Sequence, residues 1–223
     1  MTTPFTKSDV DEFRNLIESN EGWKQIINKP ELQLYSQSVE KGMKFKYSTS
    51  ILKNITPLEF YEMQNDLAFQ KTLSDNVLLS EVVTQIDSCQ AIVHRVMKLP
   101  LFDPRDMVIQ VLNYRNKDDS EVILMFKSVE SDVQPVKGSV RAIVYYQGFR
   151  MKRTEEGSVF TMYSHCDMGG NMSGMNGDTQ LKMMAKGMPK KMKENMEKFK
   201  KWNEKNKDRE KPWLENKLDW MNE

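Results

Sequence analysis

From Val77 to Cys166 the sequence predicts one β-strand after another, with no helical pattern between them. Each apolar run is short and ends at a charged, glycine or proline turn, which is typical of strands joined by tight connections. Strands that follow one another without a crossover helix pair antiparallel. We expect six strands, at Val77–Ile86, Gln90–Leu99, Met107–Tyr114, Glu121–Val129, Ser139–Met151 and Ser158–Cys166. This region therefore predicts a large antiparallel sheet.

Two helices are predicted before these strands. Residues 8–19 place apolar side chains on one helical face, and Ser8 is the expected N-cap. Residues 56–75 predict a single second helix. Thr56 is its expected cap, and Pro57 occupies the first helical position, where its missing N–H costs nothing.

Three more strands are expected between these helices. Residues 22–39 have a period of two and are interrupted at Asn28–Pro30, which predicts two short strands. Residues 43–51 alternate apolar side chains with Lys44, Lys46 and two serines. This alternation predicts a strand with one buried face and one face, carrying both lysines, in solvent.

A glycine-rich turn after Asp167 leads into a methionine-rich helix that begins near Thr179. Its lysines lie off the apolar stripe, which indicates an amphipathic helix. Pro189 removes a helical hydrogen bond, so we expect it to start the second half of a kinked or broken helix. The stripe consists of Leu181, Met184, Ala185, Met188, Met192, Met196 and Phe199.

The order helix, three strands, helix, six strands, long helix predicts an α+β fold with helices on one side of the sheet. Nine strands with two substantial helices indicate a strongly curved sheet. We expect residues 1–202 to form the domain. Residues 203–223 form a mixed-charge extension, which Trp213 and Trp220 make too apolar for a solvated tail.

Composition excludes several classes of function. The formal net charge of +1 argues against non-specific nucleic-acid binding. No apolar run is long enough to span a membrane, and no signal peptide is visible, so we expect a cytoplasmic protein. Cys89 and Cys166 have no spacing motif and fit a reducing compartment without disulfides.

No catalytic arrangement is visible. His94 and His165 could join the two cysteines around zinc, but structural zinc sites use closely paired ligands, which favours ordinary strand residues. The glycines after Asp167 match neither phosphate-loop motif, which favours a flexible loop. We therefore expect no catalytic residue, no metal and no cofactor.

Several motifs together resemble the START family of lipid-binding domains. "LPLFDPRDMVIQV" is similar to the family's strand entry, with Arg105 and Asp106 in place. "KGSVRAIVYYQGF" is similar to the strand that carries Val140 and Arg141, and "HCDMGGNM" resembles the turn into the C-terminal helix. The resemblance extends over residues 22–202.

The resemblance implies a helix-grip fold, in which a curved antiparallel sheet surrounds a long C-terminal helix and encloses a hydrophobic tunnel. It also implies binding of a phospholipid, sterol or sphingolipid without catalysis. The turn at Asp167 lacks the family's proline. Gln70 and Val111 stand where phosphatidylcholine-binding and sterol-binding members, respectively, carry an arginine, so neither recognition pattern transfers; Gln147 matches a ligand-contacting glutamine.

The methionines suit a wall that adapts to a flexible ligand, because methionine is unbranched and repacks easily. The same stripe also fits plain core packing, and its lysines fit either a solvated face or contact with anionic head groups. We expect the lipid-binding residues to be Glu81, Arg95, Ile109, Arg141, Tyr145, Gln147, Tyr163, Met184, Met188 and Met192. We expect a gate at Gly169, Gly170, Gly174, Gly177 and Pro189.

Glu81 and Arg95 form a candidate polar pair. They lie opposite each other if the hairpin turn is Asp87–Cys89, and each is flanked by apolar residues two positions away. Either they form an interior ion pair that a head group helps to satisfy, or they form an exposed cross-strand pair.

The sequence leaves three hypotheses. The first is a monomeric lipid-transfer or lipid-sensing protein that contacts membranes transiently. The second is an enzyme that uses the same cavity on a hydrophobic substrate. The third is a scaffold with a vestigial cavity and a docking segment around Trp213 and Trp220.

Overall fold

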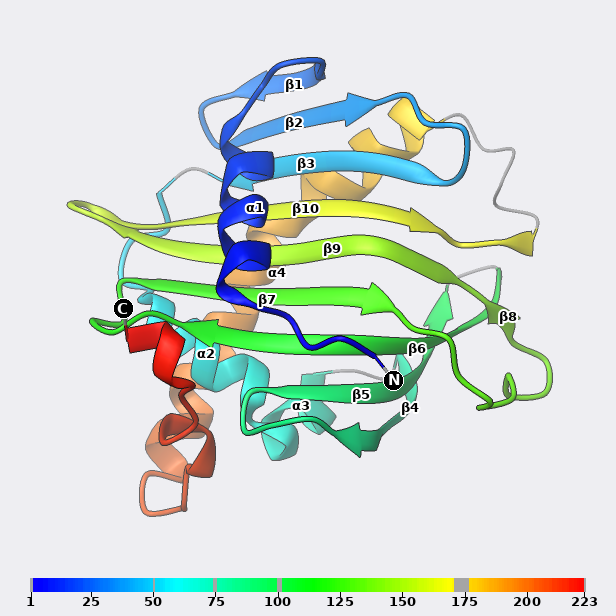
Figure 1. Ribbon diagram of the computed structural model, residues 1–223. Helices are drawn as coiled ribbons and strands as arrows, with labels where there is room; N and C mark the ends of the chain where they lie inside the picture. The colour runs from blue at the N-terminus through cyan, green and yellow to red at the C-terminus, as the bar shows by residue number, and fades with distance from the viewer. Residues whose placement is uncertain (1, 50, 74–75, 100–101, 171–176, 223) are drawn as a thin grey trace.

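A sheet of ten strands organises the molecule (Figure 1). The structure is a computed structural model that describes residues 2–49, 51–73, 76–99, 102–170 and 177–222. The strand order is β1-β2-β3-β10-β9-β7-β6-β5-β4, and the short β8 pairs parallel with β6. The strands are β1 Lys24–Lys29, β2 Leu32–Gln37, β3 Met43–Thr49, β4 Val77–Gln85, β5 Gln90–Leu99, β6 Phe102–Arg115, β7 Glu121–Ser128, β8 Val140–Arg141, β9 Ile143–Thr154 and β10 Gly157–Asp167.

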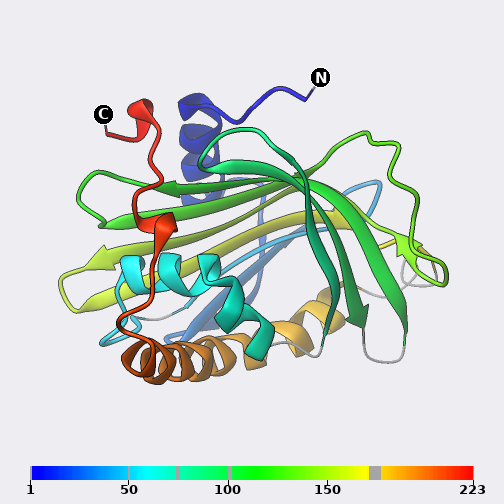
Figure 2. The ribbon, with the colours of Figure 1, turned by 90° about the horizontal axis from the view of Figure 1, so that it is seen from below.

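Helices cover both faces of this sheet (Figure 2). One face, called the inner face here, carries α2 (Pro57–Asn65), α3 (Leu67–Leu73) and the long α4 (Gly177–Lys205). The outer face carries α1 (Lys7–Glu18) and the last residues of the C-terminal segment, which crosses to it from the end of α4. These features confirm the predicted α+β class and the long C-terminal helix, but the prediction that all helices lie on one side of the sheet is wrong, because α1 packs on the outer face.

The side chains of each strand alternate between two cores. The inner core contains Phe45, Leu124 and Phe160, which pack with α2 and α4 residues. The outer core contains Leu112 of β6 and Ile123 of β7, which pack with α1. The period of two therefore buries apolar residues on both faces, because each face has its own helix.

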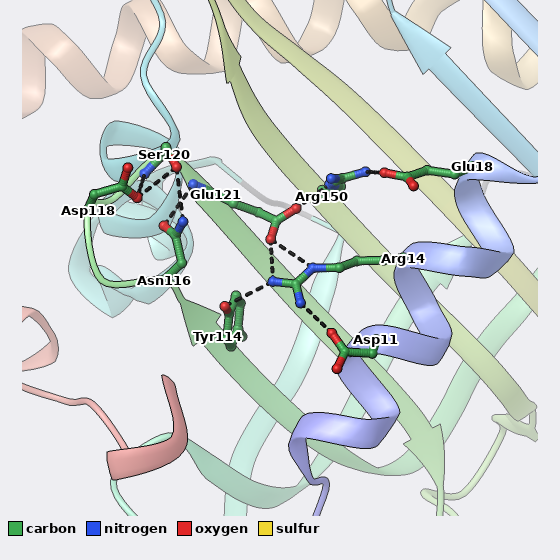
Figure 3. A network of polar contacts seen from close by, with 9 residues as sticks. All are labelled: Asp11, Arg14, Glu18, Tyr114, Asn116, Asp118, Ser120, Glu121 and Arg150. Carbon is green, nitrogen blue, oxygen red and sulfur yellow. Dashed lines mark hydrogen bonds and ion pairs between the residues drawn. The ribbon is translucent and has the colours of Figure 1, made fainter. Parts of the chain in front are cut away.

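α1 is fixed to the outer face by a network of charges (Figure 3). Arg14 donates to Glu121 on β7 and to Tyr114 on β6, at 2.9 Å between Arg14 Nη2 and the Tyr114 hydroxyl. Arg150 on β9 donates to Glu121 and, at 2.8 Å, to Glu18. The hydrogen bond from Arg150 holds the pKa of Glu18 below its usual value. The network joins α1 to three strands.

Thr6, rather than the expected Ser8, caps α1. The Asp9 carboxylate accepts a hydrogen bond from Thr6 N at 2.7 Å, which completes a capping box. Thr56 and Pro57 start α2 as predicted, with Glu59 in the equivalent capping box.

The predicted single helix over residues 56–75 is in fact two helices. Asp66 ends α2 in an extended conformation, and its Oδ1 accepts from Phe69 N at 3.0 Å. An aspartate that caps the next helix competes with continuation of the first one. The chain turns at this residue, and α3 follows.

Lys46 is buried, contrary to the prediction that it faces solvent. Only 2% of its surface is exposed. Its ammonium donates to the Ile17 and Ser19 carbonyls at the end of α1, and it lies 5.1 Å from the centre of the Trp23 ring. Burial lowers the pKa of Lys46. The β3 face that was expected to be solvated is instead covered by the C-terminal end of α1.

Two further boundaries differ from the prediction. The strand expected at residues 139–151 is divided at Ala142 into β8 and β9. α4 continues through Pro189 in the described residues, so the expected break is not present there. The predicted domain boundary at residue 202 falls inside α4.

The C-terminal segment packs back onto the domain in two 3₁₀ turns, Pro212–Leu214 and Asp219–Asn222. Trp213 packs against the inner core, and Met221 is buried in the outer core. The Trp220 ring stacks on Tyr114, with 6.0 Å between the ring centres.

Candidate functional site

The inner face carries apolar side chains that retain exposed area although helices cover them. The pairing of Val111 with Phe126 and of Leu124 with Phe149 places these residues on that face. Tightly packed cores bury such side chains almost completely. The half-buried set on this face comprises Met97, Val111, Phe126, Phe149, Met168, Met188 and Met192.

Two grooves border α4 where it passes Pro189. One, of about 760 Å³, lies between α4 and the segment Ile51–Ile55 and includes Met196. The other, of about 520 Å³, lies between α4 and the β1–β2 hairpin and has Ile27 in its lining. Both combine an apolar floor with lysine rims. The rim lysines are Lys29, Lys53, Lys182, Lys186, Lys190, Lys193 and Lys200.

Arg95 is a charged residue on the inner face. It pairs with Met107 of β6 and with Ser80 of β4. Its Nε is buried and has no hydrogen-bond partner among the described residues. Burial lowers the pKa of Arg95, although guanidinium stays charged at any ordinary pH.

The predicted pairing of Glu81 with Arg95 is wrong. Next to the turn the register is as expected, with Gln85 opposite Ala91. An irregularity between Val82 and Thr84 then shifts the register by one residue, so Glu81 lies opposite His94. A one-residue shift moves a side chain to the other face of the sheet.

Glu81 and Arg141 belong to a network on the outer face, away from α4. His94 Nε2 lies 2.9 Å from Asp106 Oδ2, and His94 Nδ1 lies 3.4 Å from Glu81. Arg141 Nε lies 3.0 Å from Asp106 Oδ1, and its Nη2 donates to the Val133 carbonyl. Glu81 and Arg141 therefore lie on the face of the sheet opposite to the expected lipid-binding side.

The two predicted tyrosines are not inner-face residues either. Tyr163 is buried in the outer core, edge-on to Trp23 at 6.0 Å, and burial raises its pKa to about 12. Tyr145 is 37% exposed, and its ring centre lies 4.5 Å from that of His165.

The remaining predicted residues lie on the inner face or in α4. Ile109 is buried in one cluster with Val93 and Met107, the neighbours of Arg95. Gln147 on β9 lies opposite Phe126 on β7 and Ser164 on β10. Met188 and Met192 pack partly buried against the inner core. The side chain of Met184 lies outside the described part of the structure.

The predicted gate is only partly described. Gly169 and Gly170 have φ values of 62° and 58°, a conformation that favours glycine. Gly177 begins α4, Pro189 lies inside that helix, and Gly174 lies outside the described residues.

Sequence reasoning gave no role to Arg105, which fixes the start of this turn. Its Nε donates to the Met168 carbonyl at 2.6 Å, and its Nη2 donates to the Gly169 carbonyl at 3.4 Å. Arg105 was recognised as part of the strand-entry motif. The contact could not be found from sequence, because its acceptors are backbone atoms of a distant turn.

In the described structure His94 contacts Glu81 and Asp106, and His165 contacts the Lys41 carbonyl, so no hydrogen bond joins either histidine to a cysteine. Among the described residues, no three side chains of histidine, cysteine, aspartate or glutamate are grouped as metal ligands. None of the helices in the described ranges is long and apolar enough to span a membrane.

Known proteins share this architecture. The family model described as the START domain matches residues 5–205. Human STARD10 superposes with a TM-score of 0.81 at 20% sequence identity, over 96% of this chain and 89% of that chain. Human StAR-related lipid transfer protein 5 superposes with a TM-score of 0.70 at 17% identity, over 89% of this chain and 95% of that chain. No curated protein sequence matches the chain significantly.

Proposed function

Because the chain belongs to the START domain family, we propose that it binds a single lipid between the inner face and α4, and carries or senses that lipid between membranes. The family match confirms the resemblance read from the sequence, and the superpositions confirm the helix-grip fold. START domains are lipid-binding modules, and one of the superposed structures is itself a lipid transfer protein.

The half-buried inner-face side chains are the observation that supports this proposal most strongly. Met188 and Met192 on α4 face the inner core, which includes Phe126 and Phe149 at its margin. Each methylene that moves from water into such surroundings contributes about 0.8 kcal/mol. A methionine and aromatic wall can therefore hold an acyl chain or a sterol and repack around its shape.

The lysine-rimmed grooves beside α4 support transient contact with a membrane. Lysines near an anionic surface contribute about 1 kcal/mol each, and the apolar floors offer area for insertion. We propose that the protein acts as a monomer, peripheral to membranes, without catalysis. The ligand is a phospholipid, sterol or sphingolipid.

Lipid capture tests the proposal directly. Purified protein is incubated with vesicles of phosphatidylcholine, phosphatidic acid, cholesterol and ceramide, repurified, and analysed by mass spectrometry. We expect one lipid per protein. Val111→Trp, which places a large ring on the inner face, should remove the bound lipid without unfolding the protein. Val136→Trp, in an exposed loop, is the matched control.

The alternatives give different results. Wild-type protein that carries no lipid would favour the scaffold with a vestigial cavity. Val111→Trp protein that carries as much lipid as wild type would place the ligand elsewhere. Chemical turnover of the lipid that depends on His94 or His165 would favour an enzyme.

A further inference from the structure

Arg95 differs from every other arginine in the described chain. The others each contact a carboxylate or a backbone carbonyl, on the outer face, at turns or in the C-terminal segment. Arg95 has no hydrogen bond and no ion pair among the described residues, and its Nε is out of contact with solvent. Arg105 and Arg115 lie on the same face through β6, but each of them donates to a backbone carbonyl.

The strand neighbours of Arg95 offer it no counterion. Val93 and Met97 flank it along β5, and Met107 lies opposite on β6. The hairpin irregularity at Val83 turns Glu81 to the outer face, where His94 contacts it. Arg95 is therefore half-buried among hydrocarbon side chains, with Ser80 opposite it on β4.

The carboxylates of α2 and of the turn between α2 and α3 are already paired. Glu62 binds Lys211 at 2.5 Å, and Asp66 pairs with Arg209. Glu59 lies 3.2 Å from Lys200. None of these groups is free to neutralise Arg95, so its charge is left without a protein counterion in the described structure.

A partly buried guanidinium whose buried Nε has no partner is unfavourable unless another group pairs with it. A guanidinium presents donors in a planar fork that matches the two oxygens of a carboxylate or phosphate. The hydrocarbon around Arg95 strengthens such a contact, because the local dielectric constant is low. The missing counterion is thus an oxyanion that brings apolar surface with it.

We propose that Arg95 binds the oxyanion of the lipid, a phosphate or carboxylate, so that the preferred ligand is an acidic or phosphate-bearing lipid rather than a neutral one. This inference rests on the proposed lipid-binding function and specifies its ligand class. The hydrocarbon chain then extends from Arg95 past Met107 toward Phe126 and the methionines of α4. Val93 and Met97 exclude water from the contact.

Matched lipids that differ only at the oxyanion test this assignment. Oleate is compared with oleyl alcohol, and phosphatidic acid with the diacylglycerol of the same chains, each presented in micelles of the same uncharged detergent. Bound lipid is measured by mass spectrometry after repurification. Wild-type protein should prefer the charged member of at least one pair by about tenfold or more. A preference for oleate would identify a carboxylate as the bound group, and a preference for phosphatidic acid would identify a phosphate.

Three variants connect that preference to Arg95. Arg95→Met keeps the apolar length and removes the charge, so the preference should disappear while neutral lipid is retained. Arg95→Lys keeps the charge without the fork and should retain part of the preference. Arg153→Met removes an exposed arginine that donates to the Asp119 carbonyl in a turn, and it should bind like wild type.

Stability provides a second measurement. Lipid-free Arg95→Met protein should melt at a temperature equal to or above that of lipid-free wild type, because an unpaired charge is gone. Arg95→Gln is the substitute if the methionine variant does not fold. A second outcome is that inorganic phosphate alone raises the melting temperature of the wild type as much as the lipids do. That result would make Arg95 a site for a free anion and overturn the proposal that the oxyanion belongs to a lipid.

The outcomes separate the two proposals. Wild-type protein that binds both members of each pair equally well, or Arg95→Met protein that keeps the preference, overturns the role of Arg95 and leaves lipid binding intact. Wild-type protein that binds no lipid overturns the proposed function itself.

Discussion

Gly148 leaves no room for a side chain at the contact between the sheet and α1. A Cβ at this position would lie 2.3 Å from Cε2 of Phe13, whose ring is fully buried in the outer core. Gly187 is the opposite case, because nothing lies within 4 Å of an added Cβ in the middle of α4.

This contrast predicts opposite effects for the same substitution. Gly148→Ala should lower the free energy of unfolding by about 1–3 kcal/mol, because the core is overpacked. Gly187→Ala should raise it by about 0.5–1 kcal/mol, because alanine restricts the unfolded chain and favours the helix. Urea unfolding measures both. A Gly148→Ala protein as stable as wild type would show that Phe13 moves aside freely.

Asp66 concentrates several interactions in one buried carboxylate. It accepts from Phe69 N and from Trp202 Nε1 at 2.9 Å, and it pairs with Arg209. Burial alone would raise the pKa of Asp66, but the hydrogen bonds from Arg209 and Phe69 outweigh it and lower that pKa.

The lowered pKa fixes the direction of a pH effect. The unfolded state binds the proton more readily, so the stabilisation is complete above the ordinary aspartate pKa of about 3.9 and is lost as pH falls through the lower folded value. Asp66→Asn should cost about 2–3 kcal/mol at neutral pH. It should also flatten the fall in stability as the pH drops below about 4. An unchanged slope in the variant would show that other carboxylates cause the acid sensitivity.

At the scale of elements, the first turn of α4 is held to the sheet edge by Asp178. Its carboxylate accepts from Lys24 at 2.6 Å and from Ser36 at 2.9 Å, and the Lys24 bond lowers its pKa. The N-terminal half of α4 buries Leu181 and Ala185 in the inner core, whereas the far end buries the larger Met196 and Phe199 there. The N-terminal end of α4 is therefore the end that we expect to separate first.

A disulfide between Ser36→Cys and Asp178→Cys tests whether α4 must move. The two native side chains are already in contact, so the cysteines can approach within bonding range. Oxidation should block lipid exchange between vesicles, and reduction should restore it. Each single variant, treated with the same oxidant, is the control. Exchange at the wild-type rate in the oxidised double variant would place the gate away from α4.

Elements also show where sequence reasoning succeeds and where it fails. Periodicity located most strands and the capped start of α2, because local residues determine them. It could not predict that the β4–β5 register changes at Val83, which a one-residue irregularity decides. It placed Lys46 in solvent, because the covering helix end is distant in sequence. The prediction that Tyr163 contacts the lipid failed for the same reason, because α1, which is distant in sequence, covers the outer face and buries Tyr163 in a second core.

At the scale of the whole molecule, the C-terminal segment is part of the folded domain. Arg209 reaches Asp66, the Leu214 carbonyl accepts from Arg115, and Trp220 stacks on Tyr114. The segment thus connects the helices of the inner face to the strands of the outer face.

Removal of residues 206–223 should therefore destabilise the protein rather than release a tail. We expect a loss of about 3–5 kcal/mol, comparable with deletion of one large buried aromatic residue. Equilibrium unfolding in urea measures it, and a chain that ends at residue 221 is the control for truncation itself. A shortened protein with full stability, but without a binding partner, would favour a docking role for Trp213 and Trp220.

The position of β10 has a consequence for synthesis of the chain. β10 lies between β3 and β9, with Cys166 opposite Met43, so the middle of the sheet joins distant parts of the sequence. On the ribosome, β3 emerges early and has an unpaired edge until β10 follows. Distant pairing of this kind slows folding. Nascent chains that end before β10 should thus require chaperones, and the sheet can close only after β10 has been translated.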